Sequence, residues 1–273
     1  MIFDFHSHVL PGLDDGAAHW EESIVLARMA FEAGVRKLAV TPHYLEGSYG
    51  NSRAKVLPLV QEFQEHLAGA RIEIEVLAGT EAYLSPELPD LVLRGEVATL
   101  GDRMKHVLVE FPMREFPPYA EDVLFGLQLK GIVPIIAHPE RNREIARRPE
   151  RLYELISRGA LAQVNAGSLL GGYGTEIREV AEILVRHRLI HFLGSDAHSA
   201  LRGYPPIRGA FERIRQIAGD EDAHGIAWEN PEAVASGAAV RPFEIVPLRK
   251  GGAFRSEGKG LLGRLGGLLR GRR

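Results

Sequence analysis

The chain of 273 residues is 45% hydrophobic and 25% charged, with a formal net charge of −3. This composition is that of an ordinary globular protein and excludes a fibrous or largely disordered chain. The sequence contains no cysteine, which excludes disulfides, thiolate zinc sites and a cysteine nucleophile.

Basic residues are concentrated at the carboxyl terminus. Residues 249–273 contain eight Lys and Arg side chains and one acid, Glu257, which leaves the remainder of the chain distinctly acidic. A nucleic-acid partner is therefore not expected. We predict one domain over residues 1–248, followed by a flexible basic tail rich in Gly, Arg and Leu over 249–273. The tail is either simply solvated or makes a weak contact with an anionic membrane or a protein partner.

The amino terminus lacks the pattern of a secretory signal. No basic region, apolar stretch and cleavage site precede the first predicted strand, and the sequence contains no run of eighteen apolar residues. We therefore expect a cytoplasmic protein.

Short segments rich in Val, Ile and Leu alternate with longer amphipathic segments. This order is typical of βα units and a mainly parallel sheet, so the predicted fold class is α/β. Seven strands are predicted, at Ile2–His6, Lys37–Thr41, Ile72–Ala78, His106–Phe111, Val133–Ala137, Ala160–Asn165 and Ile190–Gly194. Helices are predicted at Glu21–Ala33, Arg53–Leu67, Glu121–Lys130, Glu144–Arg158, Thr175–His187 and Pro206–Ala218. Residues Ser85–Asp102 indicate a short helix and an irregular connection, and Asn230-Pro231 indicates the capped start of a terminal helix.

Most predicted strands end in side chains that can bind a metal ion. These are His6, His8, His43, Glu81, Glu110, His138, Asp196 and His198. In a barrel of parallel strands the carboxyl ends converge on one face, which makes these residues predicted neighbours. Each of them alone could be a packed histidine or a surface carboxylate. Their recurrence at so many separate strand ends favours a shared site.

The chemical type of these side chains limits the choice of metal. Imidazole and carboxylate groups without thiolate suit manganese, iron or zinc. One ion cannot use so many ligands, so we predict two or three divalent ions, with Glu81 as a candidate bridge. Clustered ions produce hydroxide from water at neutral pH and neutralise phosphate oxygens. The pattern therefore favours phosphoester hydrolysis.

Two arginines follow predicted ligands closely. Arg141 comes three residues after His138, and Arg202 comes four residues after His198. Both loops could place a guanidinium group above the ions, where its planar fork can bind a phosphoryl group at two points. The alternative for each arginine is an ion pair with a nearby acid such as Glu140.

Together these motifs resemble the polymerase and histidinol phosphatase (PHP) superfamily. Within it, the sequence is most similar to the bacterial manganese-dependent protein tyrosine phosphatases of capsule and exopolysaccharide synthesis. The resemblance covers roughly residues 1–240 and rests on His6–His8, Asp14–Gly16, Thr41–His43, Gly79–Glu81, Glu110, His138–Arg141 and Ser195–His198, with support from HVLPGLDDGA at 8–17 and NAGSLLGGYG at 165–174.

The resemblance implies a distorted (β/α)7 TIM-like barrel with three metal sites. The three ligand sets would be His6, His8, Glu81 and Asp196; Glu81, Glu110 and His138; and Asp15, His43 and His198, with Asp14 as the alternative to Asp15. The expected metal is manganese, with iron or zinc as alternatives. Arg141 and Arg202 would bind the phosphate.

The resemblance also implies hydrolysis of phosphotyrosine on a membrane-associated bacterial tyrosine kinase of capsule or exopolysaccharide synthesis. The predicted mechanism is in-line attack of a metal-activated hydroxide on phosphorus, without a covalent phosphoenzyme. Tyrosine phenolate, with a pKa of about 10, is a fairly good leaving group, so a strong general acid is not required. His43 or His198 could act as the acid if the third metal site is empty.

Three alternatives remain open at this point. One is a PHP phosphatase that acts on histidinol phosphate, a sugar phosphate or a nucleotide. Another is an amidohydrolase, which also begins with His-x-His, although Glu81 stands where many of those enzymes have a modified lysine. The third is a non-catalytic, metal-stabilised regulatory binding module.

Overall fold

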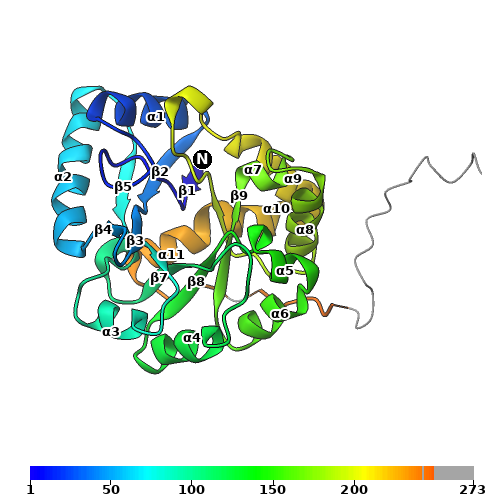
Figure 1. The fold of residues 1–273 in the computed structure, drawn as a ribbon. Coiled ribbons are helices and arrows are strands. Elements are labelled where there is room, and N and C mark those ends of the chain that lie inside the picture. Colours follow the sequence, from blue (N-terminus) through cyan, green and yellow to red (C-terminus); the bar gives the residue numbers. More distant parts are fainter. Residues whose placement is uncertain (242, 249–273) are drawn as a thin grey trace, which may run out of the picture.

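The computed structural model describes residues 1–241 and 243–248, in which helices surround a central group of strands (Figure 1). The predicted tail at 249–273 lies outside the described residues. Strands and helices alternate along the chain, which confirms the predicted α/β class. Among the described residues, no helix is both long and apolar enough to cross a membrane.

Each of the seven predicted strand segments overlaps a strand, although β2 begins two residues before its predicted segment. These strands are β1 (Ile2–Asp4), β2 (Val35–Val40), β5 (Glu75–Ala78), β7 (His106–Glu110), β8 (Val133–Ala137), β9 (Leu161–Asn165) and β10 (Phe192–Gly194). The sequence pattern does not predict three shorter strands, β3 (His43–Leu45), β4 (Tyr49–Gly50) and β6 (Glu81–Tyr83). β3 follows β2, and β6 follows β5, after interruptions of two residues. Each of these strand pairs therefore occupies a single βα unit.

The strands form two sheets, which together make one ring. The first has the order β1-β2-β5, and the second has the order β10-β9-β8-β7-β6-β3-β4. All pairings are parallel except that of β3 with β4. Beyond the ends of β1 and β10, Ser7 and Ala197 form an isolated parallel bridge, and the amide of Asp196 donates to the carbonyl of His6 at 2.8 Å. The result is a distorted TIM-like barrel whose strand ends meet on one face.

Alternating side chains on the strands divide the core into two clusters. On β7 and β8, Leu108 and Ile135 belong to a small cluster with Phe3, Phe5 and Phe192, whereas their neighbours Val107, Val109 and Ile136 belong to the larger cluster shared with the helices. This alternation is the period of two that a β-strand imposes. The small cluster therefore lies on the face of β7 and β8 opposite to the larger, helix-packed cluster.

The helices pack on the outside of the strands through apolar stripes. The longer ones are α1 (Trp20–Glu32), α2 (Arg53–Gly69), α4 (Ala120–Leu129), α8 (Thr175–Arg186) and α9 (Ile207–Ala218), in agreement with the prediction. Shorter elements are α3 (Leu88–Leu93), α7 (Ala166–Leu169), α10 (Asp220–His224), α11 (Asn230–Ser236), a π-helix at Gly225–Glu229, and 3-10 turns at Leu100–Asp102, Pro139–Arg141 and Ala200–Arg202. In α1, the buried residues Ser23, Leu26, Ala27 and Ala30 follow the spacing of one helix face.

Two local predictions are wrong. The helix predicted at Glu144–Arg158 is divided into α5 (Arg143–Arg147) and α6 (Glu150–Ser157), because Arg148 leaves the helical conformation immediately before Pro149. Asn230 does not cap a helix, because its backbone is itself helical and continues the π-helix into α11. Its side chain instead donates to the carbonyl of His191 at 3.1 Å.

Candidate metal centre

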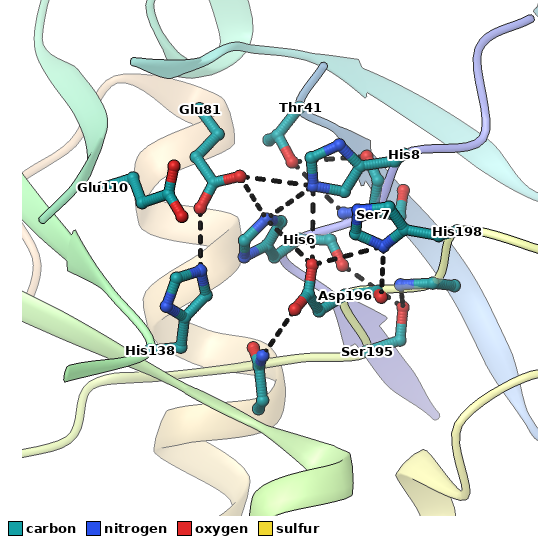
Figure 2. A network of polar contacts seen from close by, with 12 residues as sticks. His6, Ser7, His8, Thr41, Glu81, Glu110, His138, Ser195, Asp196 and His198 are labelled. Carbon is teal, nitrogen blue, oxygen red and sulfur yellow. Dashed lines mark hydrogen bonds and ion pairs between the residues drawn. The ribbon is translucent and has the colours of Figure 1, made fainter. Parts of the chain in front are cut away.

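The predicted ligand residues follow or flank the carboxyl ends of the strands, and Figure 2 shows seven of them together: His6, His8, Glu81, Glu110, His138, Asp196 and His198. His6 and His8 follow β1, His138 follows β8, and Asp196 and His198 follow β10. In addition, His43 begins β3, Glu81 begins β6 and Glu110 ends β7. The short strands β3 and β6 thus carry two of these residues past the ends of β2 and β5 and into the face where the other side chains meet.

Four buried side chains form the innermost group. Nε2 of His6 lies 3.0 Å from Nε2 of His8, and both nitrogens lie near Oε2 of Glu81, at 3.2 and 3.3 Å. Oδ1 of Asp196 lies 3.6 Å from His6 Nε2 and 3.5 Å from His8 Nε2. All four residues are buried. These atoms come from three separate strand ends and surround one common point.

The Glu81 carboxylate provides the test of whether a cation fits here. Its Oε2 atom is buried and forms no hydrogen bond, although Nε2 of His6, Nε2 of His8 and Nδ1 of His43 all lie within 3.3 Å of it. A buried oxygen without a hydrogen bond is costly in a folded protein. Nitrogen and oxygen donors gathered around such an atom are the type of ligand set that divalent transition metals bind. The residues present therefore fit a metal ion.

A second group involves both oxygens of the same carboxylate. Nε2 of His138 lies 2.8 Å from Oε1 of Glu81. Nδ1 of His43 lies 3.0 Å from Oε2 of Glu81 and 3.7 Å from Oε2 of Glu110. His43, expected only in the third ligand set, thus also faces the second set through Nδ1. Its Nε2 atom points to the third set, where it lies 3.6 Å from Asp15 Oδ1.

The third group lies closer to the surface. Nε2 of His198 is 3.4 Å from Oδ1 of Asp15, and ligand atoms of His8, Asp15, His43 and His198 all lie within 4.8 Å of one another. The Asp15 side chain is 59% exposed. The predicted set of Asp15, His43 and His198 is therefore brought together, with His8 next to it.

Asp14 and Asp15 occupy different positions. The buried Asp14 carboxylate lies 2.8 Å from Nδ1 of His8, accepts the amide of His43 at 2.9 Å and accepts the amide of Gly16 at 3.0 Å. A side chain at Gly16 would collide with the carbonyl oxygen of His8, since a Cβ built there lies 2.0 Å from that atom. The loop folds back tightly on His8, which leaves Asp15 as the carboxylate that faces the centre.

Two of the predicted ligands have an unusual backbone conformation. His138 has a φ angle of 29° and Asp196 has one of 58°, both in the region that normally favours glycine. Hydrogen bonds hold both residues in place, from the amide of His138 to Gln163 Oε1 at 3.3 Å and from the amide of Asp196 to the carbonyl of His6 at 2.8 Å. Such strain costs about 1–3 kcal/mol per residue and is concentrated at functional sites.

The charges of the centre favour an added cation. Burial alone would lower the pKa of His6, but the negative charges of Glu81 and Asp196 raise it to about 9. Burial would raise the pKa of Glu81, but the charge of His6 and the contacts with neighbouring imidazoles lower it well below its usual value. The buried carboxylates thus stabilise positive charge. Without a metal ion, protons on the imidazoles supply this charge, and a bound metal ion replaces those protons.

The two predicted phosphate-binding arginines differ in their surroundings. Arg141 donates to Oδ2 of Asp196 at 2.8 Å, and its guanidinium lies 4.7 Å from the centre of the Tyr173 ring. It therefore pairs with a predicted ligand and not with Glu140, which accepts a backbone amide instead. Arg202 is exposed on its 3-10 turn. Burial raises the pKa of Tyr173, and the charges of Arg141 and Arg202 oppose that increase.

Several buried polar residues support the centre without being predicted to do so. Asp4 accepts the amide of Ser195 at 2.7 Å and the hydroxyl of Tyr204, and so ties the end of β1 to the end of β10. Gln163 and Asn165 on β9 contact predicted ligands through their side-chain amides. The sequence signal for the last two is a pair of polar residues within an otherwise apolar strand, Leu161–Asn165.

Comparisons with known proteins agree with this geometry. Residues 2–236 match the family described as "Capsular polysaccharide synthesis, CpsB/CapC". The tyrosine-protein phosphatase YwqE of Bacillus subtilis is 40% identical over 198 residues, which cover 72% of this chain and 78% of YwqE. The tyrosine-protein phosphatase CpsB of Streptococcus agalactiae is 26% identical over 239 residues, which cover 85% of this chain and 98% of CpsB.

Two solved structures match this chain, one at high and one at low sequence identity. The crystal structures of YwqE from Bacillus subtilis and CpsB from Streptococcus pneumoniae, described as unique metal-dependent tyrosine phosphatases, match with a TM-score of 0.86 at 34% identity, covering 91% of this chain and all of the matched chain. A histidinol phosphate phosphatase from Lactococcus lactis matches with a TM-score of 0.51 at 15% identity, covering 80% and 94% of the two chains. At that identity, the second match supports the fold alone.

Proposed function

Since this chain belongs to the CpsB/CapC family, we propose that it is a metal-dependent protein tyrosine phosphatase of capsular polysaccharide synthesis. Membership of the family also confirms the resemblance drawn from the sequence motifs. Relatives that are named tyrosine-protein phosphatases cover more than two thirds of this chain. The proposal combines their activity with the cluster of histidines and carboxylates described above.

The observation that carries the proposal is the position of Glu81. Its two carboxylate oxygens face different imidazoles, with Oε1 at 2.8 Å from His138 and Oε2 within 3.3 Å of His6 and His8. A carboxylate in this position can bridge two ions. Such a bridge is the feature expected of a centre that hydrolyses phosphate esters and not of a single structural ion.

The distances support the ligand sets that the sequence resemblance implies. We assign one ion to His6, His8, Glu81 and Asp196, a second to Glu81, Glu110 and His138, and a third to Asp15, His43 and His198. His43 also faces the second set through Nδ1. We propose manganese as the native metal, because mixed imidazole and carboxylate ligands suit it, with iron or zinc as alternatives.

The side chains of the centre perform separate tasks in the hydrolysis. When bound, the ions supply hydroxide at neutral pH and neutralise the phosphate oxygens. Arg141 lies against Asp196 at the edge of the centre and can donate to the phosphoryl oxygens through its free nitrogens. We assign the second phosphate contact to Arg202, which is exposed on the turn that follows His198. His43 and His198 are half-buried and can donate a proton to the departing phenolate where they do not hold an ion.

The substrate we propose is a phosphotyrosine side chain on a protein, in the cytoplasm. The candidate is a membrane-associated tyrosine kinase of the same biosynthetic system. The basic sequence at 249–273 would provide a weak contact with an anionic membrane or with that partner. A phenolate leaves readily, which suits a centre in which half-buried histidines are the proposed acids.

Metal removal and refilling tests the proposal. The chelated protein should lose activity towards a phosphotyrosine peptide, and Mn²⁺ should restore it in step with two or three bound ions per chain, measured by elemental analysis. The same assays with histidinol phosphate, a sugar phosphate and a nucleotide should give much lower kcat/KM values. Full activity after complete chelation would disprove the metal assignment, and a preference for a small substrate would disprove the substrate assignment.

A further inference from the structure

Strand β9 reaches the candidate metal centre without supplying a predicted ligand. Its last residues include Gln163 and Asn165, whose side chains are fully buried. Buried amides need hydrogen-bond partners, and these two find them among the predicted ligands. These contacts connect β9 to the predicted ligands.

The two amides form a continuous chain of hydrogen bonds between two ligands of the same proposed ion. Nδ1 of His6 lies 3.0 Å from Oε1 of Gln163. Nε2 of Gln163 donates to Oδ1 of Asn165 at 2.9 Å, and Nδ2 of Asn165 donates to Oδ2 of Asp196 at 2.7 Å. His6 and Asp196, on opposite ends of this chain, lie side by side in the centre (Figure 2).

A backbone amide fixes the direction of these hydrogen bonds. The amide nitrogen of His138 lies 3.3 Å from the same Gln163 atom that faces His6, and a backbone N–H can only donate. That atom of Gln163 must therefore be the oxygen. As an acceptor, it requires the proton of the neutral His6 ring to be on Nδ1. The lone pair of His6 is then on Nε2, which faces Glu81 and Asp196.

The other end of the chain orients the Asp196 carboxylate. Oδ2 accepts from Asn165 at 2.7 Å and from Arg141 at 2.8 Å. Oδ1 is left facing Nε2 of His6 and Nε2 of His8, at 3.6 and 3.5 Å. Each of the two ligands is therefore turned so that its free electron pair points to the common position.

The close approach of Gln163 to His6 depends on a glycine in the neighbouring strand. Gly194, the last residue of β10, pairs with Asn165 across the sheet. A Cβ built at Gly194 would lie 2.7 Å from Nε2 of Gln163 and 2.6 Å from Cβ of His6. The absence of a side chain at Gly194 thus permits the close approach of Gln163 to His6.

We propose that Gln163 and Asn165 are positioning residues that set the tautomer of His6 and the orientation of Asp196 for metal binding. This inference rests on the proposed function, because it assumes that an ion binds between His6 and Asp196. Residues that orient metal ligands in this way typically change metal affinity by about 10–100-fold when they are replaced.

The first experiment measures Mn²⁺ affinity by calorimetry on the chelated full chain. Gln163→Met removes the acceptor at similar size and should weaken binding at one site by about 10–100-fold. Gln163→Glu keeps an oxygen towards His6 but loses the donor to Oδ1 of Asn165, so it should recover only part of that loss. The matched control is Gln64→Met, because Gln64 also bridges two elements, donating to Ile74 and accepting from the amide of Val76 far from the centre. This control should bind Mn²⁺ like the wild type.

A second measurement needs no variant and decides the question if Gln163→Met does not fold. Nitrogen NMR of histidines in the Zn²⁺-loaded wild type should show His6 with its proton on Nδ1 and with Nε2 bound to metal. A proton on Nε2, or unchanged Mn²⁺ affinity in Gln163→Met, or equal weakening in Gln163→Met and Gln163→Glu, would overturn the inference. A wild type that binds no Mn²⁺ would instead overturn the proposed function.

Discussion

Oε1 of Glu81 lies 2.8 Å from Nε2 of His138, so this carboxylate directs its second oxygen to a different set of imidazoles. No other predicted carboxylate in the described part of the chain lies within 3.3 Å of as many histidines. Replacing Glu81 therefore distinguishes between two models, a centre whose ions share this carboxylate and a set of independent ion sites.

We expect Glu81→Gln to lower kcat by more than about 100-fold, beyond what the loss of an outer hydrogen bond causes. The amide keeps the size of the side chain but removes the charge that two ions would share, so elemental analysis should find at least one ion fewer per chain. Glu75→Gln is the matched control, since Glu75 lies on the preceding strand, is 65% exposed and pairs with Lys37. Full metal content and unchanged kcat in Glu81→Gln would contradict the bridging role.

Arg141→Lys should weaken phosphate binding although it keeps the positive charge. Lysine cannot bind an anion at two points, and the loss of one charged hydrogen bond is worth about 1.5–3 kcal/mol, or about 10–100-fold in kcat/KM. Inhibition by inorganic phosphate should weaken in parallel. Arg151→Lys is the control, because the Arg151 guanidinium also lies 4.7 Å from a ring centre, that of Phe116. Equal phosphate inhibition in wild type and Arg141→Lys would exclude Arg141 from the phosphate site.

Asp14 and Asp15 should respond differently to the same replacement. Asp15→Asn should remove one bound ion and leave the stability of the metal-free protein nearly unchanged, because this side chain is 59% exposed. Asp14→Asn should lower the free energy of unfolding by about 1–3 kcal/mol, since a buried acceptor of several hydrogen bonds is lost. Metal analysis and urea unfolding measure the two effects. The reverse pattern would make Asp14 the ligand.

The buried His191 should make the protein less stable in acid. Burial lowers its pKa from 6.5 to about 4, and its Nδ1 accepts the amide of Ala162 at 3.3 Å, which requires an unprotonated nitrogen. The unfolded chain therefore binds the proton more tightly, and stability falls as the pH drops from 6.5 towards 4. Between pH 7 and pH 5 this amounts to about 2 kcal/mol.

Urea unfolding at the two pH values checks this expectation. His191→Gln cannot take up a proton, so its loss of stability between pH 7 and pH 5 should be about 2 kcal/mol smaller than that of the wild type. The exposed His66 provides the control variant His66→Gln, which should keep the wild-type dependence. An identical dependence in His191→Gln and wild type would show that His191 is not responsible.

Much of the fold could be predicted because it depends on local patterns. The apolar runs of the seven strands are bounded by polar residues, and the ligand types stand at their ends, where parallel topology brings them together. The two wrong helix predictions have different physical reasons. The predicted helix at Glu144–Arg158 ran through Pro149, which disfavours helical backbone at the residue before it and separates α5 from α6. Asparagine favours a helix cap, but the backbone at Asn230 is helical and continues the π-helix into α11.

The supporting residues could not be predicted because their partners are distant in the sequence. Gln163 gains its role only when the barrel brings its side chain to His6, which is 157 residues away in the sequence. The choice between Asp14 and Asp15 depends on the loop that folds back on His8, which no spacing rule describes. Periodicity identifies strands and their ends, whereas hydrogen-bond partners require the assembled barrel.

The left-handed backbone at His138 and Asp196 implies a conflict between durability and activity. Glycine adopts this conformation without steric strain, so His138→Gly or Asp196→Gly would relieve the local backbone while removing a proposed metal ligand. Selection for heat resistance alone would therefore tend to erode the centre at these two positions. A thermostable descendant that kept its catalysis would have to gain its stability elsewhere in the barrel.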